Sequence, residues 1–235
     1  MALPVFITAV GAALPSRILT NEQIVAGMPW LDVSAEWVRE HTGIRTRHVA
    51  QPGEWATDLG LRAASQALAR APGGAGAIDL ILMATNTAQF VYPAGAAMIQ
   101  EGLERNGQAM PRAAAMDLQQ GCASFVAGII LAAAMVQSGH CRQVLVVGAD
   151  VATRMVDWTD RSSVLLGDGA AACVVSDRRP ATTAATPSLQ ILGSFLCTAP
   201  DRESIYQRGV LDERNDPFQH MAWACRSACR SSAPP

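Results

Sequence analysis

The sequence contains no lysine, because all 18 of its basic residues are arginine. The arginines are dispersed along the chain, and the formal net charge is only -2 at pH 7. Nucleic acids and anionic membranes attract clustered positive charge, which this sequence lacks. We therefore expect neither nucleic acid nor a membrane surface as a partner.

Long hydrophobic runs are also absent. The longest apolar stretch, residues 125–136, is shorter than the roughly 20 residues that a transmembrane helix needs. The N-terminal stretch 1–16 has no basic residue ahead of its apolar ones, unlike a secretory signal peptide. These two absences predict a cytoplasmic protein without a membrane segment.

The cysteines lack the paired spacing that is typical of zinc sites, and nothing in the sequence points to secretion. We expect free thiols and no bound metal. The six cysteines are Cys122, Cys141, Cys173, Cys197, Cys225 and Cys229.

Hydrophobic residues make up 50% of the chain, which is enough for a large core. Short apolar runs typical of strands alternate with helical patterns. The strands are almost continuously apolar, as in sheets that helices cover on both faces. We therefore predict an α/β fold with αβα layers. Strands are expected at 5–10, 78–86, 113–119 and 143–150, and helices at 21–26, 34–41, 57–70, 94–106 and from 122.

The composition divides the chain into three segments. Residues 1–177 carry the regular alternation of strands and helices, and 178–221 open with the Pro/Thr-rich linker RRPATTAATPS before another strand begins at SLQILGSFL. Residues 222–235 have no periodicity.

A single cysteine, Cys122, stands between the expected strand 113–119 and a long apolar helix. Backbone N–H groups without partners at a helix N-terminus favour a thiolate and can bind an oxyanion. Gly121 permits the sharp turn that such a position needs. Lone cysteines are also often small buried hydrophobic residues, and position alone leaves both interpretations open.

Three motifs occur in order along the chain. They are SAEWVREHTGIRTRHVA at 34–50, DLQQGCASFVAGI at 117–129, and VVGADVATRMVDWTDRSSVLLGDGAAACVV at 146–175. Together they resemble the β-ketoacyl-acyl carrier protein synthase III family of the thiolase superfamily, over most of residues 3–177. The resemblance implies a thiolase-like fold whose N-terminal half is complete and whose C-terminal half is largely missing.

The resemblance also implies a chemistry. Cys122 would accept an acyl group from acyl-CoA, and decarboxylation of malonyl carrier protein would supply the carbanion that attacks the thioester, in fatty acid or polyketide-type biosynthesis. Acyl-CoA is then a substrate and acyl carrier protein a partner, with no further cofactor. The family's assembly implies a homodimer, or a heterodimer with a related synthase.

Three further residues match family positions. The resemblance implies that Trp37 stacks on the CoA adenine, that Arg161 contacts the nucleotide end, and that Tyr92 reaches across a dimer into the partner's acyl pocket. The alternatives are packing of Trp37 in an amphipathic helix, a surface salt bridge at Arg161, and a plain buried loop around Tyr92. GDGA at 167–170 is expected to form a tight turn packed near the site.

The chain departs from the family pattern before TGI, where the family often has arginine. Here the residues are Glu40, His41 and Thr42, which puts part of the expected grip on CoA in doubt.

The family's second half holds a histidine in an H-x-A-N motif and an asparagine in a G-N-T-S motif, and neither motif occurs here. The final string WACRSACRSSAPP stands where the family has M-x-G-x-x-V-F, and a one-base shift of its codons restores most of that pattern. We therefore interpret the tail as out of frame, with a genuine divergent C-terminus as the alternative. Cys225 and Cys229 would then have no role.

Three functions stay open on the sequence. The first is a condensing enzyme, impaired by the missing histidine and asparagine. The second is a non-catalytic truncated product, or a subunit that works only with a full-length partner. The third is a module that binds acyl-CoA and holds the acyl group on Cys122. If condensation occurs, His220 is the first candidate for the missing base.

Overall fold

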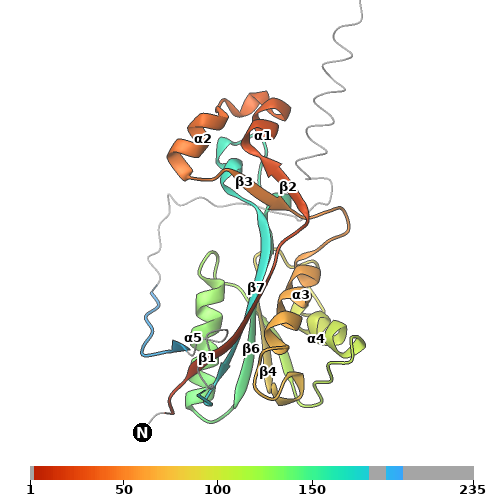
Figure 1. Ribbon diagram of the computed structural model, residues 1–235, viewed down its shortest axis with the longest axis vertical. Coiled ribbons are helices and arrows are strands. Elements are labelled where there is room, and N and C mark those ends of the chain that lie inside the picture. The colour runs from red at the N-terminus through yellow and green to blue at the C-terminus, as the bar shows by residue number, and fades with distance from the viewer. Residues whose placement is uncertain (1–2, 180–188, 198–235) are drawn as a thin grey trace, which may run out of the picture. The chain divides into compact units, whose positions relative to one another are not determined.

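A computed structural model describes residues 3–179 and 189–197, which form two compact units (Figure 1). The first unit contains residues 3–13, 55–150, 170–179 and 189–197, and the second contains 14–54 and 151–169. Each unit is described by itself. The expected linker, the tail at 222–235, His220, Cys225 and Cys229 lie wholly or largely outside the described residues, so these and the three-segment division stay predictions.

A six-stranded sheet lies in the first unit, with the strand order β5-β4-β6-β7-β1-β8. β4 runs parallel to both β5 and β6, whereas β1 runs antiparallel to β7 and β8. The last residue of β6 and the first two of β7 belong to the second unit. The strands are β1 Phe6–Ala13, β4 Leu80–Ala84, β5 Ala114–Leu118, β6 Gln143–Val151, β7 Asp168–Ser176 and β8 Leu189–Gln190.

Helices cover both faces of this sheet, as Figure 1 shows. A Cβ on Gly128 of α5 (Ser124–Gln137) would lie 2.9 Å from Val146, whereas one on Gly60 of α3 (Ala56–Leu68) would lie 3.2 Å from Val147. Neighbouring residues of a strand point to opposite faces, so α5 and α3 lie on opposite sides. α4 (Gly95–Arg105) packs beside α3, and the predicted αβα layers are confirmed.

The face that α5 covers holds a continuous apolar core. Most of its buried side chains come from strands β4, β6 and β7 and from α5 itself, and they include two cysteines. Its members are Val5, Leu80, Leu82, Ala132, Ala133, Val136, Cys141, Val144, Val146, Cys173 and Val175. Within the described residues, no helix is both long enough and apolar enough to cross a membrane.

The second unit holds two short helices, α1 (Asn21–Gly27) and α2 (Ala35–Thr42), and a two-stranded antiparallel sheet. The sheet pairs β2 (Arg17–Thr20) with β3 (Thr46–Val49), which the sequence patterns did not indicate because each strand has only four residues. 3₁₀ turns complete the unit. Its core consists of Leu19, Ile24, Met28, Leu31, Val38, Val49, Val156, Trp158 and Val164.

A buried polar pair crosses this second unit. The Asn21 side chain donates to the Ile44 carbonyl oxygen at 2.7 Å and accepts from the Arg47 guanidinium at 2.7 Å. Arg47 also donates to the Val164 carbonyl oxygen at 3.0 Å. Burial lowers the pKa of Arg47, because a charged guanidinium is less favourable away from water.

The expectation of a tight turn at GDGA was wrong, because β7 begins at Asp168 and includes the second glycine. The buried Asp168 carboxylate accepts hydrogen bonds from the backbone N–H groups of Ala50 at 2.7 Å and Thr153 at 2.9 Å, and from the Thr153 hydroxyl at 2.7 Å. A Cβ on Gly167 would lie 3.0 Å from the Arg47 side chain. This glycine therefore permits close packing at the start of a strand.

Candidate active site

Cys122 lies in a tight turn between β5 and α5. β5 ends at Leu118, Gly121 adopts a left-handed conformation with φ 55°, and α5 begins at Ser124. The sequence placed the helix start at Cys122 itself, two residues earlier. The thiol of Cys122 is exposed. An exposed side chain at this position excludes the alternative of a small buried hydrophobic residue.

The buried side chain of Ser124 holds this turn together. Its Oγ accepts from the Gln120 backbone N–H at 2.6 Å and donates to the Gly121 carbonyl oxygen at 2.7 Å. The Ser124 backbone N–H also donates to the Gly121 oxygen, at 3.1 Å. Cys122 is thus carried by a backbone segment that is bonded on both sides. N–H groups at this end of α5 can stabilise negative charge on a sulfur or oxyanion beside them.

The other described cysteines are free thiols in different surroundings. Burial raises the pKa of Cys173 to about 12. Burial, and secondarily the nearby Asp79 carboxylate, raises the pKa of Cys141. Cys197 is exposed, like Cys122. Among the described cysteines, only Cys122 combines exposure with a position before a helix.

A hollow of about 250 Å³ lies at the carboxyl ends of β4 and β5. Its wall includes Gln119, which leads into the Cys122 turn, and Phe90 and Val91, which precede Tyr92. The first unit thus brings the Cys122 turn and the Tyr92 loop to one region. Tyr92 is 84% exposed, so the alternative of a buried loop is wrong. The lining residues are Thr85, Asn86, Ala88, Phe90, Val91, Asp117, Leu118 and Gln119.

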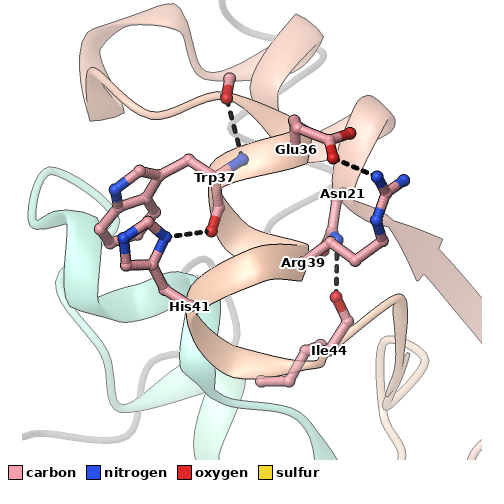
Figure 2. A network of polar contacts seen from close by, with 7 residues as sticks. Asn21, Glu36, Trp37, Arg39, His41 and Ile44 are labelled. Carbon is pink, nitrogen blue, oxygen red and sulfur yellow. Dashed lines mark hydrogen bonds and ion pairs between the residues drawn. The ribbon is translucent and has the colours of Figure 1, made fainter.

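Trp37 lies on α2 in the second unit, where it stacks on His41 (Figure 2). The two ring centroids are 4.5 Å apart with an interplanar angle of 23°, and His41 Nδ1 lies 2.9 Å from the Trp37 carbonyl oxygen. Ser34 caps the helix by accepting from the Trp37 N–H at 3.0 Å. Trp37 is half-buried against the core of the unit. One face of the indole is therefore already covered by a ring of the chain itself.

Arg161 is exposed in the same unit, at the start of a 3₁₀ turn, Arg161–Leu165. The Asp160 side chain caps this turn by accepting from the Ser162 N–H at 2.7 Å. That hydrogen bond lowers the pKa of Asp160. Among the described residues, no group of three or more His, Cys, Asp or Glu side chains is arranged to hold a metal ion.

The sequence of this chain is similar to those of known proteins. The family described as 3-oxoacyl-[acyl-carrier-protein] synthase III matches residues 116–196. The β-ketoacyl-[acyl-carrier-protein] synthase III of Acidiphilium cryptum is 41% identical over 167 residues, which cover 71% of this chain and 50% of the relative. The enzyme of the same name from Rhodobacter capsulatus is 40% identical over 186 residues, covering 79% and 55%.

Solved structures agree with these relatives. The synthase III of Thermus thermophilus superposes with a TM-score of 0.64 at 37% identity, covering 72% of this chain and 50% of that one. A priming β-ketosynthase of the R1128 polyketide biosynthetic pathway superposes with a TM-score of 0.66 at 33% identity, covering 74% and 50%. The chain belongs to the β-ketoacyl-acyl carrier protein synthase III family. The predicted thiolase-like fold is confirmed, and this synthase III-family chain spans about half the length of the curated relatives it matches.

Sequence reasoning missed the polar groups around the turn of this synthase III-family chain. Asp117 accepts from the Gly95 and Ala96 N–H groups at 2.7 and 2.8 Å and so caps α4. Asn86 and Asp150 form a second cluster that reaches the Gly121 carbonyl oxygen. The available signal was their place at or just past the carboxyl ends of the parallel strands β4, β5 and β6, where polar side chains gather at one edge of the sheet.

Proposed function

We propose that Cys122 accepts an acyl group from acyl-CoA, as the first half of a β-ketoacyl synthase reaction. The Cys122 sulfur attacks the thioester carbonyl, a new sulfur–carbon bond forms, and CoA leaves as the thiol after taking up the cysteine proton. The observation that carries this proposal is the exposed thiol in a hydrogen-bonded turn at the start of α5. Membership of the synthase III family supports it.

In the second half of the proposed reaction, malonyl carrier protein loses carbon dioxide and its carbanion attacks the Cys122 thioester. The carbon–carbon bond forms as the bond to the Cys122 sulfur breaks, which returns the thiolate. Acyl carrier protein is thus the second proposed partner. Fatty acid or polyketide-type biosynthesis is the setting that the names of the relatives support.

The CoA end would lie against the second unit. Trp37 would stack on the adenine, and the exposed Arg161 would contact the nucleotide end. Because His41 covers one face of the indole, a base that stacks on that face must displace the imidazole. Alternatively, the adenine would stack on the opposite face of the Trp37 indole.

The acyl chain would enter the region between the Cys122 turn and the Tyr92 loop. The hollow there is partly apolar, since Phe90, Val91 and Leu118 contribute to its wall. We propose that Tyr92, which is exposed, completes the pocket of a partner subunit in a homodimer or a heterodimer with a related synthase.

The alternative function is a subunit that depends on a full-length partner, or a non-catalytic product. The observation behind it is the absence of the H-x-A-N and G-N-T-S motifs from these 235 residues. Acyl transfer to Cys122 needs only groups near the turn, whereas condensation also needs stabilisation of an enolate. A third possible function is a module that binds acyl-CoA and only holds the acyl group on Cys122.

The test is incubation of the full chain with a series of acyl-CoAs of increasing length, followed by intact-mass and peptide mass spectrometry. We expect a mass increase of one acyl group, located on Cys122. Cys122→Ser should remove it, and Cys197→Ser, which removes the other exposed thiol of the described residues, should retain it. Acylation that persists in Cys122→Ser would contradict the proposal.

A further inference from the structure

A hydrogen-bonded cluster around Asp150 joins the end of β6 to the loop that follows β4. The Asp150 carboxylate accepts from the Asn86 backbone N–H at 2.7 Å, from the Asn86 side-chain amide at 3.3 Å, and from the hydroxyls of Thr87 at 3.0 Å and Thr85 at 3.2 Å. Thr85 and Thr87 are buried. One carboxylate therefore fixes both the backbone and the side chain of Asn86.

Asn86 also connects the Asp150 cluster to the Cys122 turn. Its side-chain amide nitrogen, besides facing Asp150, donates to the Gly121 carbonyl oxygen at 3.2 Å. That oxygen also accepts from the Ser124 N–H and from the Ser124 hydroxyl. Three donors thus converge on the carbonyl of the residue just before Cys122.

The planar peptide bond links the direction of the Gly121 oxygen to that of the Cys122 N–H. The Gly121–Cys122 peptide is trans, and in a trans peptide the C=O and N–H groups lie in one plane and point in opposite directions. Donors that fix the direction of the Gly121 oxygen also fix the direction of the Cys122 N–H. Gly121 has no Cβ to restrict its backbone dihedral angles, so the peptide that follows it can rotate unless something holds it.

We propose that Asn86, oriented by Asp150, is a positioning residue that locks the Gly121–Cys122 peptide and so aims the Cys122 N–H and thiol at an incoming thioester. This inference rests on the proposed function of Cys122. Ser124 supplies the two other donors, so loss of Asn86 leaves the turn folded but less restrained. The expected defect is therefore in the rate of acyl transfer, with binding of acyl-CoA unchanged.

The test compares Asn86→Ala and the similarly sized Asn86→Leu, which lacks the donor and adds no charge beside Asp150, with the wild-type chain. Acylation of Cys122 is followed by intact mass at several acyl-CoA concentrations, which separates the maximal rate from half-saturation. We expect a maximal rate about 10- to 100-fold lower with an unchanged half-saturation concentration, the size of effect that a small misplacement of a reacting group produces. An unchanged maximal rate in Asn86→Ala would overturn the inference.

Asp79→Asn is the matched control. The Asp79 carboxylate also holds backbone N–H groups, those of Arg142 at 2.7 Å and Gln143 at 3.1 Å, but it precedes β4 and so lies at the opposite end of the sheet. Thermal unfolding of all variants measures the structural effect separately. An equal rate loss in Asp79→Asn and Asn86→Ala would show a general loss of structure and overturn the inference.

Hydrogen exchange separates this inference from the proposed function. Amide exchange at Ser124, whose N–H donates to the Gly121 oxygen, needs no acyl-CoA, and we expect it to be faster in Asn86→Ala than in the wild type or in Asp79→Asn. If the wild-type chain is not acylated, the proposed function fails, but faster exchange would still support the lock. Unchanged exchange at Ser124 would overturn the lock whatever the acylation result.

Discussion

At the scale of single residues, reactivity is decided by where a thiol lies. Cys173 is buried among strand side chains, and burial raises its pKa to about 12 because no solvent stabilises the thiolate. Cys122 is exposed in its turn, just before helix α5.

We expect Cys122 to be alkylated faster than Cys141, Cys173 and Cys197. With a pKa of about 12, only about one Cys173 thiol in 10⁴ is ionised at about pH 8, and the ionised fraction rises as the pH approaches 12. Cys197 is the informative comparison because it is also exposed. Iodoacetamide labelling mapped by mass spectrometry measures all four rates, and equal labelling would contradict the electrostatic argument for the turn.

At the scale of elements, helix α2 carries the departure from the family pattern. Glu40, His41 and Thr42 stand where the family often has arginine, and the His41 ring stacks on Trp37. The first turn of the helix is fixed by Ser34 and a surface ion pair joins Glu36 and Arg39, so the ring pair lies on a well-formed helix (Figure 2).

His41→Arg should strengthen binding of acyl-CoA. A permanently charged guanidinium can form charge-assisted hydrogen bonds to phosphate, each worth about 1.5–3 kcal/mol, so we expect about 10-fold lower half-saturation by acyl-CoA. The maximal rate of acylation should stay the same, since α2 carries no group of the Cys122 turn. Titration with acyl-CoA measures both, and a higher half-saturation would show that the histidine itself contributes to binding.

Strand β5 bears on whether the chain associates with other chains. It lies at one end of the sheet order, and Met116 in it is exposed. An apolar edge strand tends to pair with another chain. Light scattering at micromolar concentration should therefore show dimers or aggregates, and Met116→Lys should shift the population towards monomer. A clean monomer of the wild-type chain would count against the thiolase-type assembly.

At the scale of the whole molecule, the two halves of the proposed reaction need different residues. The groups around Cys122 suffice for acyl transfer, but the histidine and asparagine motifs of the family do not occur in these 235 residues. Loss of one oxyanion donor costs about 10²- to 10³-fold in rate, and loss of both partners should cost more.

We expect the 235-residue chain alone to show slow self-acylation at most and no detectable condensation with malonyl carrier protein. A radiochemical assay of β-ketoacyl product, with a full-length relative as the positive control, measures this. Condensation at a rate comparable to that of the relative would contradict the prediction. His220→Ala would then be the first variant to test for the missing base.

The layered α/β fold could be predicted because its signals are local. A strand such as Leu80–Ala84 shows as a short continuous apolar run, and a helix such as Gly95–Arg105 shows its period, each within a few residues. The position of Cys122 between a strand and a helix was visible for the same reason. The sequence by itself therefore determined the order of the elements from α3 to β6, the family resemblance and the candidate nucleophile.

Only the tertiary structure decided how the turn is held. Asn86 is 35 residues from Gly121 and 64 from Asp150, and no sequence period connects residues so far apart. The strand that begins at Asp168 likewise depends on partners that folding brings close, the N–H groups of Ala50 and Thr153. Hydrogen bonds form between groups that are near in space, so contacts of this kind emerge only once the chain has packed.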